Sequence, residues 1–222
     1  MVFVWGDDNG GRSTKPHITI GIIIICVLAQ AWQLYVPLAA EEAFFRAWGV
    51  TPALLVAPAQ HGIESPWLQV WPTLLTAMFL HNDLIHLAGN MYALWVFGDN
   101  VEDAVGRGRY VALYLGTGIV GSLAEVMTSQ QSLVPIIGAS GAVAGVMGAY
   151  LFLRPQATLN VGGGMQWPTW LVLPLWLCFN LFYLASGVSG VAWVAHVFGF
   201  VAGALLSLLL RRPEWRDGET AS

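Results

Sequence analysis

Charged residues are scarce in this chain. Asp, Glu, Lys and Arg together make up 10% of its 222 residues, whereas a soluble globular domain carries about a quarter. Hydrophobic residues reach 56%, and the mean hydropathy is +0.63. This composition indicates that lipid surrounds most of the protein, and it leaves little chain for a separate soluble module.

Basic clusters are missing, and cysteines are few. The net charge is only -4 and no patch rich in Lys and Arg occurs, so nucleic acid is not an expected partner. Cys26 and Cys178 both fall inside apolar runs, where a thiol behaves as a small hydrophobe more often than as a ligand or a bridge. The lipid bilayer is therefore the first partner that the sequence indicates.

Apolar runs of helical length recur six times. They predict an all-α membrane protein with six transmembrane helices, at about 18–38, 82–98, 109–128, 140–153, 168–186 and 190–210. The fourth is short for a full span, so protein or water should surround its start. The segment 39–73 is interrupted by prolines and rich in Trp. We expect it to form a long loop at the membrane surface.

The positions of the basic residues predict the orientation of these spans. Six spans place both ends of the domain on one side, and Lys and Arg are retained on the cytoplasmic side. Eight of the nine basic residues agree with one topology, and only Arg46 lies on the opposite side. We therefore predict a cytoplasmic tail at 1–17, a membrane domain at 18–211 and a second cytoplasmic tail at 212–222.

A cleaved signal peptide is the competing interpretation of the first span. Arg12 and Lys15 would form its charged region, and Leu38-Ala39-Ala40 its cleavage site. The apolar run is longer than an ordinary signal core, and interfacial aromatics stand near its far end. N-terminal sequencing of the extracted protein distinguishes the two, because cleavage would leave Glu41 as the first residue.

Polar groups at membrane depth are candidates for function because they are costly there. His86 and Asn90 are four residues apart and share one helix face. His81 is better placed in the turn before that helix, where Asn82 or Asp83 is a natural N-cap. Two histidines five residues apart do not aim at one point of a helix, which argues against a metal site.

A second group is Gly138-Ala139-Ser140-Gly141, at the start of the short fourth helix. A serine at a helix N-terminus lies beside free backbone N–H groups and the positive end of the dipole, which suit a developing oxyanion. Gly138 and Gly141 would let a substrate backbone come close. Taken alone, this motif is more often a helix cap than a nucleophile.

A third group lies in the last predicted span, where His196 stands among apolar residues. Gly199 and Gly203 follow it on one stripe, and small residues line the fourth helix as well. Such stripes let two membrane helices approach closely. The two stripes predict that Ser140 and His196 come within hydrogen-bond reach.

Together these groups resemble the rhomboid family in order and spacing. His81, His86 and Asn90 match its His-x4-His-x3-Asn element, Gly138 to Gly141 its Gly-x-Ser-Gly, and Ala195 to Gly203 its Ala-His-x2-Gly-x3-Gly. The resemblance covers most of residues 70 to 210 and implies a rhomboid-like bundle. It also implies an intramembrane serine endopeptidase that cleaves transmembrane segments of other membrane proteins.

The resemblance assigns a role to each matched residue. Ser140 would be the nucleophile and His196 the general base, without a third acid. His86, Asn90 and the Ser140 backbone N–H would form the oxyanion hole, and the site would open toward the non-cytoplasmic side. No metal or cofactor is expected.

Two departures from the family pattern stand out. Many relatives carry an aromatic residue four positions after the serine, where it stacks on the histidine, and this chain has Ala144 there. The Trp-Arg pair of the first loop is also imperfect, because Pro72 and Thr73 follow Trp71. Either His196 is held less firmly or another aromatic ring fills the space.

Other functions compete with proteolysis. A catalytically inactive rhomboid-like scaffold or binding protein is the main alternative within the family. A transporter lined by the histidines, Asn90, Asp83 and Glu125 is a second, and solute flux in vesicles would reveal it. A triad that includes Asp83 competes with the capping role, and we expect Glu125 to face the polar interface.

Overall fold

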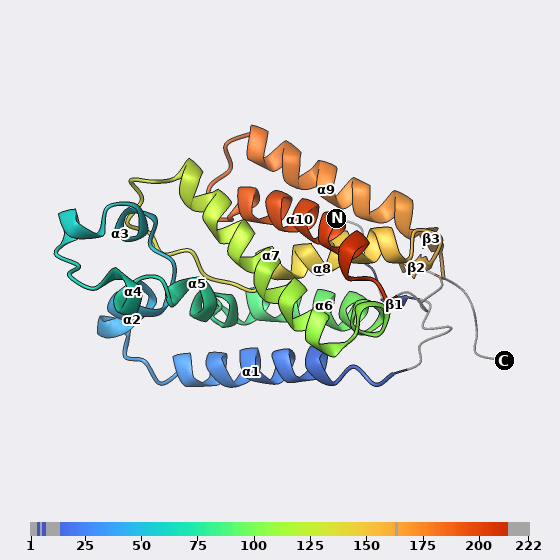
Figure 1. The fold of residues 1–222 in the computed structure, drawn as a ribbon, viewed down its shortest axis with the longest axis horizontal. Helices are drawn as coiled ribbons and strands as arrows, with labels where there is room; N and C mark the ends of the chain where they lie inside the picture. The colour runs from blue at the N-terminus through green and yellow to red at the C-terminus, as the bar shows by residue number, and fades with distance from the viewer. Residues whose placement is uncertain (1–3, 5, 8–13, 163, 213–222) are drawn as a thin grey trace.

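Helices make up most of the computed structural model, which describes residues 4, 6–7, 14–162 and 164–212 (Figure 1). The longest are α1 (His17–Gln33), α6 (Leu84–Val105), α7 (Arg107–Thr128), α8 (Ser140–Leu153), α9 (Thr169–Ala185) and α10 (Trp193–Leu210). Each predicted span is thus a helix. The largest difference is at the end of α6, which continues seven residues beyond the predicted end at 98.

Among the described residues, fewer than six helices are long and apolar enough to count as full membrane spans. By length and composition, α7 and α10 can each cross a membrane, and a third span results if α1 and Leu38–Trp48 are joined across their 110° bend. The helices α8 and α9 have 14 and 17 residues, fewer than the roughly 20 that a span needs. The six-span count is therefore not confirmed.

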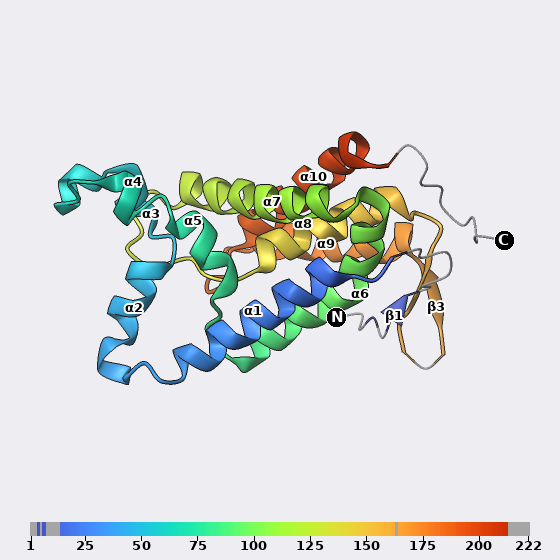
Figure 2. The same cartoon turned by 60° about the horizontal axis from the view of Figure 1, so that its bottom comes forward.

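The short helix α8 lies in the middle of the bundle, with α6, α7, α9 and α10 around it (Figures 1 and 2). Eleven of its 14 residues are buried. Protein rather than lipid therefore surrounds it, as its length predicts.

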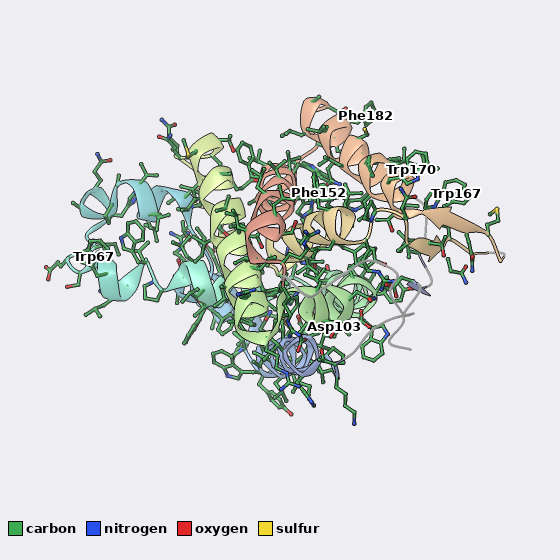
Figure 3. All side chains as sticks on the ribbon, turned by 45° about the vertical axis from the view of Figure 1, so that its right-hand side comes forward. Trp67, Asp103, Phe152, Trp167, Trp170 and Phe182 are labelled. Carbon is green, nitrogen blue, oxygen red and sulfur yellow. The ribbon has the colours of Figure 1, made fainter. Side chains whose placement is uncertain are left out.

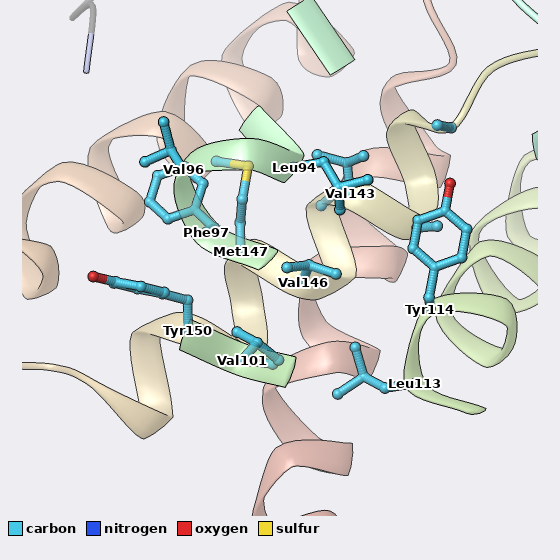
Figure 4. Close-up of a cluster of buried hydrophobic side chains, with 14 of the residues drawn as sticks. Leu94, Val96, Phe97, Val101, Leu113, Tyr114, Val143, Val146, Met147 and Tyr150 are labelled. Carbon is cyan, nitrogen blue, oxygen red and sulfur yellow. The ribbon is translucent and has the colours of Figure 1, made fainter. Parts of the chain in front are cut away.

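The main apolar core forms between α6, α7 and α8 (Figure 4). It contains Leu94, Val96, Phe97 and Val101 of α6, Leu113 and Tyr114 of α7, and Val143, Val146, Met147 and Tyr150 of α8. Bulky side chains point outward elsewhere: Trp67 on α4 (Pro66–Gln69), and Trp170 and Phe182 on α9, are all exposed (Figure 3). Such a surface suits a lipid environment.

Glycine brings α8 and α10 into backbone contact. A Cβ on Gly199 would overlap the carbonyl oxygen of Gly141, and one on Gly203 would overlap that of Gly145. Both pairs advance by four residues in the same direction, so the two helices run parallel. The predicted stripes of small residues therefore do meet, and their contact sets the spacing of the two helices.

The segment predicted as a surface loop is mostly short helices. It contains a 3-10 turn at Leu38–Ala40, α2 (Glu41–Trp48), α3 (Pro52–Val56), a second 3-10 turn at Pro58–His61, and α4. The segment leads into α5 (Thr73–Thr76) and the 3-10 turn Ala77–Phe79. Pro52, Pro58 and Pro66 stand at the starts of their helices, where proline is favoured because no intrahelical N–H is needed. The prolines thus break the segment into short helices, where an irregular loop had been expected.

The prediction of an all-α fold misses a small antiparallel sheet. Its order is β1 (Gly6–Asp7), β2 (Thr158–Asn160) and β3 (Gln166–Pro168). Gly162 and Gly164 have positive φ angles of 93° and 76° between β2 and β3, where glycine is favoured. Part of the predicted N-terminal tail is thus structured, whereas residues 213–222 of the C-terminal tail lie outside the described residues.

The glycine contact generates a stability prediction. Gly203→Ala should lower the free energy of unfolding by about 1 to 3 kcal/mol, because its Cβ would force α8 and α10 apart. Denaturant titration in detergent micelles measures this. Gly116→Ala on α7 is the matched control, since a Cβ there meets nothing within 4 Å; it should be neutral or slightly stabilising. Equal losses in both variants would contradict the close packing.

Candidate active site

Ser140 is the first residue of α8, as predicted. The chain before it is fixed by the segment that precedes α6. The Gly138 N–H donates to the carbonyl of Ala77 at 2.9 Å, and Val50 and Ile136 exchange backbone hydrogen bonds of 2.8 and 3.0 Å. The short helices of residues 38–79 therefore help to position the serine.

Gly138 lies against both Ser140 and His86. Its φ angle is +125°, a conformation that L side chains rarely adopt. A Cβ at this position would lie 2.9 Å from His86 Nε2 and 3.7 Å from Ser140 Oγ. The imidazole of His86 and the serine hydroxyl thus flank the same point, and only glycine leaves that point free.

The start of α6 fixes His86. Asp83 is the N-cap, and its carboxylate accepts from the His86 backbone N–H at 2.8 Å, which confirms the capping role. The Asn82 N–H points at His86 Nδ1 over a long 3.5 Å. If Nδ1 accepts there, Nε2 carries the ring proton and points a donor toward Gly138.

Asn90 and His81 are buried beside this group. Asn90 is 7% exposed, and among the described residues its Nδ2 has no hydrogen-bond partner. A buried donor without a partner is costly, so it is available to a ligand.

His81 precedes α6, as predicted, and its ring packs edge-on against His86 with centroids 5.1 Å apart. Gln33 of α1 exchanges hydrogen bonds of 3.2 and 2.7 Å with the His81 backbone.

His196 lies on α10, three residues before the Gly199 contact with Gly141. Ser140 directly precedes Gly141, so both side chains lie within one turn of the same helix contact. Among the hydrogen bonds of the described residues, none joins Ser140 to His196. The parallel packing brings the N-terminal ends of the two helices together. The predicted hydrogen bond between Ser140 Oγ and the imidazole is not formed in this structure.

Two indole rings flank His196. The centroid of Trp176 on α9 is 6.1 Å from that of the imidazole and that of Trp193 is 5.8 Å away, at interplanar angles of 32° and 85°. Ala144 is 1% exposed, so the departure at this position leaves no open gap. Of the two alternatives left open by the sequence, the structure shows another aromatic ring beside His196.

Glu125 has a role that its position in the sequence did not reveal. Its carboxylate accepts from the Ala195 backbone N–H at 3.1 Å, in the first turn of α10. Free N–H groups there attract a negative charge. A carboxylate near the end of one apolar run gives no sequence signal of a partner 70 residues later. Glu125 therefore fixes the helix start that carries His196.

A small pocket adjoins the serine. Its lining includes Met78, Ser122, Gly138, Ser140 and Ala195. It therefore brings together the glycine motif of α8, the first turn of α10, and α7. The predicted residues Gly138, Ser140 and Gly141 line the same hollow.

Comparison with known proteins decides the family. The family model described as the Rhomboid domain matches residues 68–213, more than half of the chain. This chain belongs to the rhomboid family. It is 45% identical over 148 residues to Rhomboid protease GluP of Bacillus subtilis, covering 65% of this chain and 27% of GluP.

Two further relatives support the same assignment. The rhomboid-type protein YdcA of Bacillus subtilis is 30% identical over 139 residues, covering 63% of this chain and 67% of YdcA. Rhomboid protein 1, mitochondrial, of Saccharomyces cerevisiae is 30% identical over 142 residues, covering 60% of this chain and 40% of the relative. The chain thus matches only part of GluP and the yeast protein. Rhomboids are integral membrane proteins, which agrees with the exposed apolar side chains of this chain.

Proposed function

We propose that this rhomboid is an intramembrane serine endopeptidase in which Ser140 is the nucleophile and His196 the general base. The observation that carries the proposal is the glycine contact of α8 with α10. Because the two helices run parallel, this contact holds their N-terminal ends, with Ser140 and His196, at the same end of the bundle. Serine alone is a weak nucleophile and needs an adjacent base. The apolar surroundings of His196 favour the neutral imidazole that a base requires.

The chemistry follows from these groups. Ser140 Oγ attacks the peptide carbonyl as His196 takes its proton, and the carbonyl oxygen becomes an oxyanion. His86 Nε2, Asn90 Nδ2 and the Ser140 N–H donate to that oxygen. The tetrahedral intermediate collapses to an acyl-enzyme when His196 protonates the leaving amine, and water then releases the acid by the reverse sequence.

The proposed substrate class follows from the lipid bilayer that surrounds the protein. The proposed partners are transmembrane segments of other membrane proteins, in which helical hydrogen bonds occupy the carbonyls. A segment must unwind before its carbonyl can meet Ser140, so helix-breaking or small residues are expected near the cleaved bond. We further propose six membrane-embedded helices, both termini in the cytoplasm, and a site that opens on the other side.

The topology generates a labelling prediction. In a Cys178→Ser background, Gln60→Cys and Gly108→Cys should react with an impermeant thiol reagent from opposite sides of sealed vesicles. Residues 60 and 108 are exposed, while the remaining Cys26 is fully buried. Labelling of both sites from one side would contradict the proposed topology.

The oxyanion hole generates a kinetic prediction. Asn90→Ala should lower kcat about 10- to 1,000-fold with little change in KM, because an oxyanion donor acts chiefly in the transition state. Hydrolysis of a single-span substrate in micelles measures both constants. A change confined to KM would remove Asn90 from the oxyanion hole.

The proposed dyad generates the decisive prediction. Ser140→Ala and His196→Ala should each abolish cleavage, and the double variant should be no worse, because nucleophile and base act as a unit. A fluorophosphonate probe should label the wild type, fail on Ser140→Ala and react poorly with His196→Ala.

Two controls keep that experiment interpretable. Ser207→Ala removes a buried hydroxyl from α10, away from the proposed dyad. This hydroxyl donates to the Ala204 carbonyl at 2.7 Å, and its loss should leave activity unchanged. All variants should stay folded, since each removes a polar group from an apolar span. Folded wild-type protein that neither cleaves nor reacts with the probe would support the inactive scaffold instead.

A further inference from the structure

One buried polar residue near the proposed site has no role in the account above. Asn180 lies on α9 and is 4% exposed. Its side-chain oxygen Oδ1 is 2.9 Å from His196 Nδ1. Because a polar side chain inside an apolar helix is costly, it marks a functional position.

The second polar atom of Asn180 determines what this contact is. Asn180 Nδ2 donates to the backbone carbonyl of Trp176, one turn earlier on α9, at 2.8 Å. The amide is therefore oriented with Oδ1 toward the imidazole. A carbonyl oxygen only accepts, so Nδ1 of His196 must carry the proton. In the neutral ring, Nε2 then has the free lone pair that a general base uses.

Neighbouring rings restrict rotation of the imidazole out of this contact. Trp176 and Trp193 flank it, Trp193 stacks on Tyr183 at 5.0 Å, and Trp176 stacks on Phe200 at 5.9 Å. Among the described residues no carboxylate bonds to the ring, and the nearby Glu125 is bound to the Ala195 N–H. The position that an acid holds in a Ser-His-Asp triad is thus taken by a neutral amide.

We propose that Asn180 is the positioning residue of His196, holding Nδ1–H and thereby presenting Nε2 to Ser140. This inference rests on the proposed protease function and deepens it. An amide in this position has precedent on unrelated folds, where Cys-His-Asn constellations work. Here it has a physical advantage, because a buried amide holds the ring without placing a charge in the apolar bundle.

Two substitutions separate positioning from packing. Asn180→Leu keeps the volume but removes the acceptor, whereas Asn180→Asp keeps an acceptor oxygen and adds a buried charge. Asn180→Leu should lower kcat on the order of 10- to 100-fold at nearly constant KM, the scale of an orientation error. Asn180→Asp should retain more activity than Asn180→Leu.

Stability should run in the opposite order. The leucine variant should unfold at the same or higher denaturant concentration than the wild type, and the aspartate variant at a lower one. A purely structural residue would instead make activity follow stability. Full activity of Asn180→Leu, or a leucine variant more active than the aspartate variant, would overturn the positioning role. Ser207→Ala is the control and should leave kcat unchanged.

Imidazole nitrogen NMR tests the same point without an activity assay. In protein labelled with nitrogen-15 at histidine, the His196 signals are identified by their loss in His196→Ala. The wild type should show Nδ1 protonated, and Asn180→Leu should shift protonation toward Nε2. Wild-type protonation at Nε2 would refute the inference while leaving the Ser140 and His196 chemistry standing. Wild-type protein that fails to cleave or label would instead refute the proposed function.

Discussion

The close backbone contact between α8 and α10 is the constraint on which the rest of the structure depends. Hydrophobic burial contributes little to helix association in lipid, so close packing must supply the attraction. Gly141 and Gly145 meet Gly199 and Gly203 without side chains. A Cβ on Gly145 would also overlap Thr117 of α7, so the third helix packs equally closely. The relative positions of Ser140 and His196 are consequently set by backbone atoms, which are less mobile than side chains.

Carboxylates stabilise the end of the bundle that lies opposite Ser140 and His196. Glu102 of α6 is buried, and its carboxylate accepts from the backbone N–H groups of Ile18 and Thr19 and from the Thr19 hydroxyl, at 2.8 to 3.0 Å. These are free donors of the first turn of α1. The same end holds Asp7, whose pKa burial raises to about 6 and whose carboxylate accepts from Tyr150 at 2.7 Å. Polar contacts thus fix both ends, with the apolar core between them.

The sequence predicts those features that depend on local pattern. The bounds of α8 were correct because a Gly-rich turn precedes an apolar run. Of the two cap candidates Asn82 and Asp83, the structure uses Asp83. The predicted end of α6 was wrong because the acidic residues after position 98 indicate the end of an apolar run. In the structure Glu102 is instead buried, and it accepts from Thr19, 83 residues earlier in the chain. The helices of 38–79 were missed because proline both starts and interrupts helices. The pairing of β1 with β2 depends on a contact between segments about 150 residues apart.

The support of His196 shows the same limit at the site itself. The family pattern places a ring on the helix of the serine, and Ala144 departs from it. In this structure the ring comes from Trp176 on α9, in an apolar run that also carries the exposed rings of Trp170 and Phe182. The polar Asn180, four residues after Trp176, marks one face of α9 as different from the lipid-facing rest, but it does not say which ring on that face contacts the imidazole. Since a histidine is held by whatever occupies the space around it, a small residue at 144 and a large one at 176 form a compatible pair.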